Sequence, residues 1–161
     1  MTLRIFVLGW VLAFGAAVAW AQDEDSKAIA HAMKKQFDRP DAPLQVAPVT
    51  VIQGYAVAGW LQTGKGGRAL LQNTQGAWNI IVCAGDGLKD AKVLESTGMS
   101  AATALQMSRA VIGAESKLSA DTRQRFASFE GFLKIGPAGA GASHGAHHAP
   151  VGHAPSGAST H

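Results

Sequence analysis

The fold is decided by residues 44–84, LQVAPVTVIQGYAVAGWLQTGKGGRALLQNTQGAWNIIVCA. β-Branched, aromatic and other apolar residues fill four runs of strand length, which are 46–52, 55–61, 68–73 and 78–83. Turn-forming residues separate these runs: Gln53-Gly54, a flexible connection over 63–67, and Thr74-Gln75-Gly76. Because connections this short join strands that run in opposite directions, the block predicts a four-stranded antiparallel meander.

Helical spacing flanks this block on both sides. Upstream, Ile29, Met33 and Phe37 recur every fourth residue, which predicts a helix over 26–37 that Asp25 or Ser26 caps. Downstream, the pattern predicts helices over 88–95, 100–118 and 121–129, and a short strand over 132–135. We therefore expect an α+β domain over 22–135, in which the N-terminal helix covers one face of the sheet and the later helices follow it. The order of elements is similar to that of the cystatin and nuclear-transport-factor folds.

Residues 1–21 have the three parts of a secretory signal peptide. Arg4 is followed by an apolar and small-residue stretch over 5–18, and Ala19-Trp20-Ala21 places small residues where a signal peptidase reads them. The apolar stretch is shorter than the roughly 20 residues that a membrane-spanning helix needs. The sequence thus predicts cleavage after Ala21, export, and no membrane span in the mature chain.

The charge and composition of the chain argue against a nucleic-acid partner and set the C-terminal segment apart. The 14 Lys and Arg residues are scattered among 11 acids, and no basic run is interleaved with aromatic residues, which argues against a nucleic-acid surface. Residues 136–161 consist almost entirely of Gly, Ala, Ser, Pro and His. Because this segment has no apolar period around which to fold, we expect it to be a disordered tail.

Five of the six histidines lie in this segment: His144, His147, His148, His153 and His161. Neutral imidazole is a favoured ligand for copper, zinc and nickel, and Cu(II) binds most tightly in the usual affinity order. His148 is close enough in sequence to His144 or to His147 for both to chelate one ion. The alternatives are a solubilising tail or the remnant of an affinity tag, but tags carry consecutive histidines and these are spaced.

Cys83, the single cysteine, cannot form an intramolecular disulfide. Thiolate and thioether sulfurs select Cu(I), so Cys83 is a candidate metal ligand. The methionines of the predicted domain are Met33, Met99 and Met107. The alternative is that Cys83 is a small buried core residue, as its neighbours Ile80, Ile81 and Val82 suggest. The sequence leaves both interpretations open.

Patterns of catalytic residues are weak. The spacing of Gly85-Asp86-Gly87 is that of neither a phosphate-binding loop nor a calcium loop. A Cys83 nucleophile would need a histidine base, and His31 falls at a solvated position of the predicted helix. The sequence predicts a protein that is not an enzyme.

Motifs in the predicted domain point to a family. They are Phe37-Asp38-Arg39-Pro40, YAVAGW over 55–60, GGRALL over 66–71 and CAGDGLK over 83–89. In combination, the chain resembles the bacterial copper uptake system-associated protein family over about residues 26–135. The resemblance implies a periplasmic accessory protein in copper acquisition, acting beside a copper chaperone or an outer-membrane copper receptor. It brings no established ligand residues with it.

Two functional hypotheses result. In the first, the histidine-rich segment captures Cu(II) through His144, His147 and His148, and the domain holds copper near Cys83 or docks a partner that does. In the second, the domain is a small-molecule or protein-binding module and the segment is incidental. A concave sheet lined by Tyr55, Trp60 and Trp78 would then accept an apolar ligand, although packing of a helix would bury the same aromatic residues.

Overall fold

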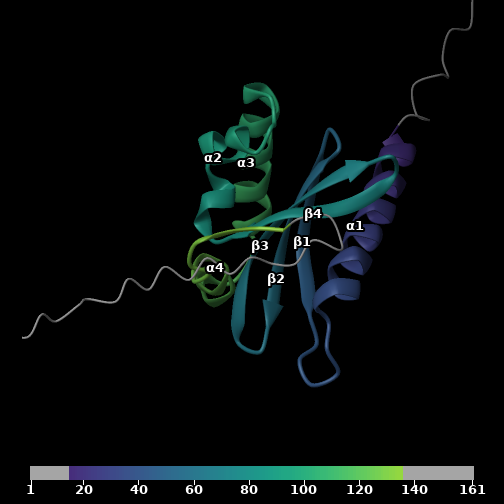
Figure 1. Cartoon of the computed structure of the whole chain (residues 1–161). Helices are drawn as coiled ribbons and strands as arrows, with labels where there is room; N and C mark the ends of the chain where they lie inside the picture. The colour runs from purple at the N-terminus through teal and green to yellow at the C-terminus, as the bar shows by residue number, and fades with distance from the viewer. Residues whose placement is uncertain (1–14, 136–161) are drawn as a thin grey trace, which may run out of the picture.

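The four expected strands form an antiparallel sheet, and the short strand expected over 132–135 extends it as a fifth (Figure 1). The structure is a computed structural model that describes residues 15–135, with side chains from residue 22 onward. The strands are β1 (Gln45–Ile52), β2 (Tyr55–Gln62), β3 (Lys65–Thr74), β4 (Ala77–Ala84) and β5 (Phe132–Lys134). They lie side by side in chain order, which confirms the meander and the α+β class.

Two-residue turns join β1 to β2, β2 to β3 and β3 to β4. The turn between β2 and β3 is shorter than the connection expected over 63–67. Thr63 and Gly64 alone make that turn, both with positive φ, as two-residue hairpins of the type I′ require. Gly66 and Gly67 lie inside β3, where a Cβ on Gly67 would stand 2.8 Å from the ring of Trp60. These two glycines are therefore packing residues and not part of a flexible connection.

The helices are α1 (Gly15–Phe37), the 3₁₀ turn η1 (Asp86–Lys89), α2 (Ala91–Ser96), α3 (Ala101–Glu115) and α4 (Ala120–Ala127). The helix expected over 88–95 is split, because the Asp90 carboxylate accepts hydrogen bonds from the N–H groups of Lys92 and Val93 and so starts a new helix.

The first helix ends at Phe37 as predicted but begins earlier than expected. Asp25 and Ser26 are not its caps, since the helix runs through them and the Ser26 hydroxyl donates to the Gln22 carbonyl at 2.7 Å. Cleavage after Ala21 would still leave the part of α1 that carries the buried residues Ile29 and Met33.

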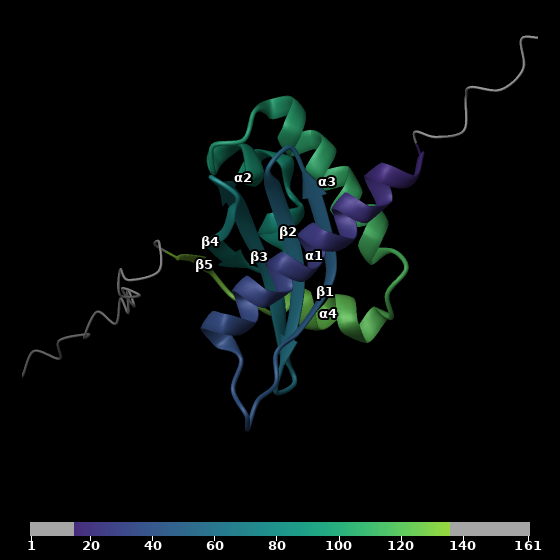
Figure 2. The same ribbon diagram turned by 90° about the vertical axis from the view of Figure 1, so that its right-hand side faces the viewer.

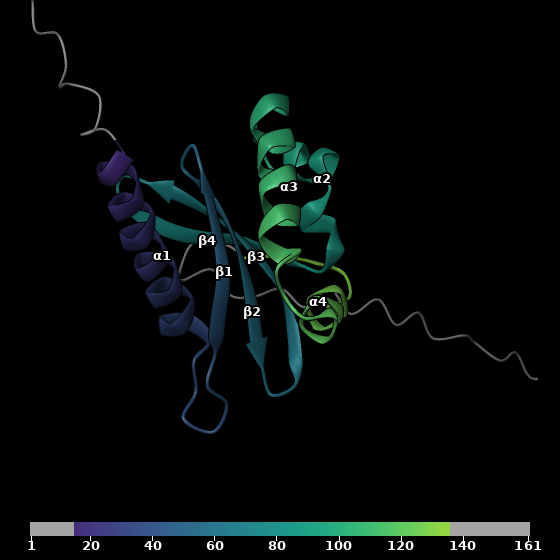
Figure 3. The same ribbon diagram turned by 180° about the vertical axis from the view of Figure 1, so that it is seen from behind.

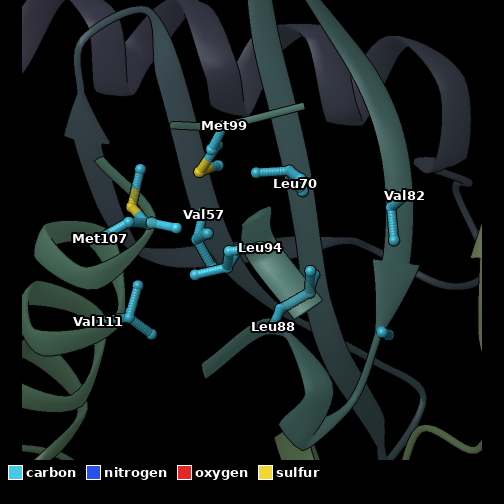
Figure 4. Close-up of a cluster of buried hydrophobic side chains, with 10 residues drawn as sticks. Val57, Leu70, Val82, Leu88, Leu94, Met99, Met107 and Val111 are labelled. Atoms are coloured by element: carbon cyan, nitrogen blue, oxygen red, sulfur yellow. The ribbon is translucent and has the colours of Figure 1, made fainter. Parts of the chain in front are cut away.

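Helices cover both faces of the sheet (Figures 2 and 3). On one face α1 packs alone, and its cluster is Ile29, Met33, Leu44, Ala56, Ala58, Ala69, Leu71, Ile80 and Cys83. On the other face pack η1, α2 and α3, and Figure 4 shows their cluster around Leu70, Leu88, Leu94 and Met107. The sequence-based expectation of a cover on one face was incomplete. Because helices cover both faces, consecutive residues of β2 and β3 are buried and exposure does not alternate along these strands.

Candidate functional site

The metal-ligand candidates of the C-terminal segment lie outside the described residues: His144, His147, His148, His153 and His161. The remaining histidine, His31, is exposed on α1, as expected. Within residues 15–135, no three His, Cys, Asp or Glu side chains come together as a group that could hold a metal ion.

Cys83 lies on β4 and faces α1. It is 6% exposed and belongs to the same apolar cluster as Ile29 and Met33. Burial raises the pKa of its thiol to about 12, so the sulfur stays protonated at neutral pH. Because the thiolate is the form that binds metals, the environment of Cys83 is that of a core residue. Its role as a Cu(I) ligand stays a prediction.

An apolar cavity of about 140 Å³ adjoins Cys83 on the α1 face. Its walls are Met33, Phe37, Leu44, Trp60, Gln62, Cys83, Phe129, Leu133 and Ile135. Of the sulfur-bearing candidates, only Met33 shares this cavity with Cys83, since Met99 and Met107 belong to the cluster on the opposite face. The polar member of the wall, Gln62, is held in place because its amide donates to the carbonyls of Phe37 and Ala42, at 2.8 and 2.7 Å.

The three aromatic residues expected to line one concave surface do not do so. Tyr55 packs against the α2–α3 side, where its hydroxyl donates to the Gly98 carbonyl at 3.3 Å. Trp60 and Trp78 lie on the α1 side, and the Trp78 indole donates to Asp25 at 3.2 Å. Alternation along a strand separates Tyr55 from Trp60, because residues an odd number of positions apart point to opposite faces.

A buried ionic network was not expected from the sequence on the face that η1, α2 and α3 cover, hereafter the helical face. Arg68 of β3 is fully buried, and its guanidinium donates to both carboxylate oxygens of Glu115 in α3, with Nε–Oε1 at 2.6 Å and Nη2–Oε2 at 2.7 Å. Nη1 also lies 3.2 Å from Oδ1 of Asp86. The guanidinium carbon is 5.5 Å from the centre of the Phe126 ring. The network thus joins β3, η1, α3 and α4 around one cation.

The rim of this network consists of charged side chains that are partly exposed to solvent. Lys89 lies 2.8 Å from the Asp86 carboxylate, which has a half-exposed side chain. Partial burial pushes the pKa of Asp86 upward, but the hydrogen bond and charge of Lys89, together with Arg68, outweigh it and hold the pKa below its ordinary value. Asp86 therefore stays ionised and bridges two cations.

One sequence feature could have revealed the pair. Arg68 interrupts an apolar strand, and Glu115 falls on the buried side of α3, in helical register with Val111 and Met107. A charged residue at a core position needs a partner of opposite charge, so Arg68 predicts a buried acid and Glu115 predicts a buried base. Because 47 positions separate the two residues, the local sequence pattern does not say that they pair with each other.

Three of the four motifs meet at this network. Gly59 of YAVAGW pairs with Arg68 of GGRALL, and Arg68 pairs with Ala84 of CAGDGLK. A Cβ on Gly59 would stand 2.6 Å from the ring of Phe126, and one on Gly85 would stand 2.6 Å from the carbonyl of Phe129. The motif glycines thus let α4 and the segment after it approach the sheet, and this close packing explains why glycine stands at these two positions.

No family model matches the chain, and neither the curated proteins nor the solved structures contain a significant match. The likeness to the cystatin and nuclear-transport-factor folds accordingly stays a pattern-level prediction. None of the helices within residues 15–135 combines the length and apolar character that crossing a bilayer requires.

Proposed function

We propose that this chain is an exported accessory protein of copper handling, which captures Cu(II) through histidines of segment 136–161 and passes it to a partner. The observation that carries the proposal is the placement of five of the six histidines in that one segment. The export signal predicted over 1–21 and the motif resemblance agree with a periplasmic place of action.

The chemistry favours His144, His147 and His148 as the primary ligands. Imidazole nitrogens suit Cu(II), and the glycine and alanine residues between these histidines offer little steric resistance to wrapping around an ion. His153 and His161 extend the set. The segment has neither Met nor Cys, so it suits Cu(II) better than Cu(I).

In this proposal the folded domain supplies the docking surface for the partner, a periplasmic copper chaperone or an outer-membrane copper receptor. Transfer of Cu(I) to Cys83 is the less favoured part of the proposal. Its thiol is buried and has a pKa of about 12, so metal binding there would require both local opening and loss of a proton.

The experiment is a Cu(II) titration of the mature chain, 22–161, beside a variant in which His144, His147 and His148 are all alanine. We expect the triple variant to lose most of its Cu(II) affinity. The matched control is His31→Ala, which removes an exposed histidine of the domain and should leave the titration unchanged. Equal Cu(II) affinity in the triple variant and the parent would contradict the proposal.

The apolar cavity favours a second candidate function, the binding of a small apolar ligand. A dry cavity near 150 Å³ is about the size that accepts a benzene ring. Trp60, in its wall, has a buried indole Nε1 with no acceptor among the described residues, so a ligand acceptor that reached this atom would complete it. Thermal stabilisation by benzene or phenol would test this candidate, with the larger effect expected for phenol, whose oxygen can accept from the indole, and Cys83→Leu, which takes up part of the cavity, should reduce it.

A further inference from the structure

The free edge of β1 lies at the bottom of an open cleft between α1 and α3. The cleft has a volume of about 930 Å³, and its walls are residues 22–26 of α1, the last four residues of β1, and one side of α3 with Lys117 after it. Figure 3 shows β1 between the two helices. Within the described residues β1 pairs only with β2, so its outer edge faces this cleft.

The strand register identifies which backbone groups point outward. Ile52 and Tyr55 flank the two-residue turn and exchange hydrogen bonds with each other. Because bonded and non-bonded pairs alternate along an antiparallel ladder, Thr50 is also bonded to β2, and the groups of Val49 and Val51 point away from it. Among residues 15–135, the main-chain hydrogen bonds outside the regular elements include none to Val49 or Val51. Two N–H and two C=O groups are thus offered to the cleft.

The depth of the cleft selects the shape of the occupant. Residues 49–52 are half-buried although they belong to an edge strand. Helices α1 and α3 flank this edge on either side, which leaves less room for the edge of another folded sheet, including β1 of a second copy, than for one strand. The occupant that fits best is a single extended segment of polypeptide.

Small residues on the α3 wall leave space for side chains of such a segment. Between Gln106 and Lys117 the wall presents the small residues Ala110, Gly113 and Ala114, and a Cβ on Gly113 would have nothing within 4 Å. Alternate side chains of an added strand would point to this wall, and β-branched apolar residues fit both the space and the strand.

Charge gives the segment an orientation. The Thr103 hydroxyl donates to Gln53 at 2.7 Å, which fixes the start of α3 beside the β1–β2 turn. Lys117, after the end of α3, therefore lies toward Val49, and it makes no ion pair within the described residues. An acidic side chain on the segment would find its partner there.

We propose that this cleft binds an extended segment of a partner protein, which adds to the sheet as a sixth strand next to β1. Val49 and Val51 supply the backbone hydrogen bonds, apolar side chains of the segment lie on the α3 wall, and an acid lies beside Lys117. This interaction goes beyond copper capture and involves none of its ligands.

The test uses the full mature chain and the synthetic peptide Glu-Thr-Val-Thr-Val-Thr-Lys, blocked at both ends, in which the acid and both valines point to the α3 wall. We expect saturable binding by calorimetry. Binding should slow amide hydrogen exchange at Val49 and Val51, while Thr50 and Ile52, already bonded to β2, serve as the internal reference.

Two variants locate the binding. Val51→Pro removes an outward N–H without removing a bond to β2, and edge strands tolerate proline at such positions. Gly113→Trp fills the cleft from a helical position that has open space. Each should weaken peptide binding at least about tenfold, whereas Leu105→Trp, on an exposed position of α3 outside the cleft, should not. If Val51→Pro fails to fold, Gly113→Trp decides. Absence of binding to the parent, or binding equal in parent and variants, would overturn the proposal.

Discussion

The two faces of the sheet are closed in different ways. A single helix, α1, closes one face through apolar contacts and leaves a cavity of about 140 Å³ beside Cys83. The other face is closed by several short helices, which a buried arginine holds together. Apolar contact is non-directional and tolerates small changes, whereas a buried ion pair depends on both of its members. We therefore expect equal-sized changes to cost much more on the helical face.

The largest effect should come from Glu115→Ala, which leaves the Arg68 guanidinium buried with only half-exposed Asp86 beside it. Removing one member of a buried pair costs about 3–5 kcal/mol. Urea unfolding would measure the loss as a lower midpoint at unchanged slope.

The control for this prediction is the double variant Arg68→Met, Glu115→Leu, which removes both charges and keeps apolar volume. It should recover much of the lost stability, because the desolvation cost disappears together with the pair. A single variant as stable as the parent would mean that the two faces do not differ in the way described above.

A smaller but still marked effect is expected for Gly59→Ala. The added Cβ would stand 2.6 Å from the Phe126 ring, so α4 must shift away from the sheet, and overpacking of this kind costs about 1–3 kcal/mol. The matched control is Gly113→Ala, which meets nothing within 4 Å and should stabilise α3 by up to about 1 kcal/mol. Thermal unfolding of both variants tests the pair, and Phe126→Leu should partly rescue Gly59→Ala.

The α1 face should respond less. Cys83→Ala removes one buried sulfur next to an existing cavity, and we expect a loss of about 1 kcal/mol. In the parent, the thiol should react with iodoacetamide far more slowly than in urea, because it is buried and its pKa is about 12. Fast labelling of the native protein at neutral pH would show that this face opens readily, which would also revive Cys83 as a metal ligand.

The same contrast explains what the sequence could predict. The strands and the end of α1 follow from local patterns: period, turn residues and the prolines after Phe37. The connection over 63–67 differs from the prediction because Gly66 and Gly67 look like turn residues, and only the packing of Leu61 on Gly66 and of the Trp60 ring on Gly67 shows their purpose. The split at Asp90 was within reach, since aspartate is a common N-cap.

The candidate site was harder to predict because it depends on long-range packing. Nothing local says that Arg68 and Glu115 meet, or that Met33 joins Cys83 while Met99 and Met107 do not. The unbroken apolar run in β2, by contrast, did contain a clue to the second helical layer, because a strand with one solvated face would alternate.

The smallest predicted effect concerns Asp86, at the rim of the ionic network. Its pKa is lowered in the folded chain, so its contribution to stability is present above the ordinary pKa of an aspartate and is lost as the pH falls through the lower, folded value. Because the side chain is half-exposed and screened, Asp86→Asn should cost no more than about 1 kcal/mol at neutral pH. The difference between parent and variant should vanish in acid, which urea unfolding at neutral and acid pH can resolve. A cost that persisted in acid would show that Asp86 holds η1 by its shape and not by its charge, and the directional character of the helical face would then rest on Arg68 and Glu115 alone.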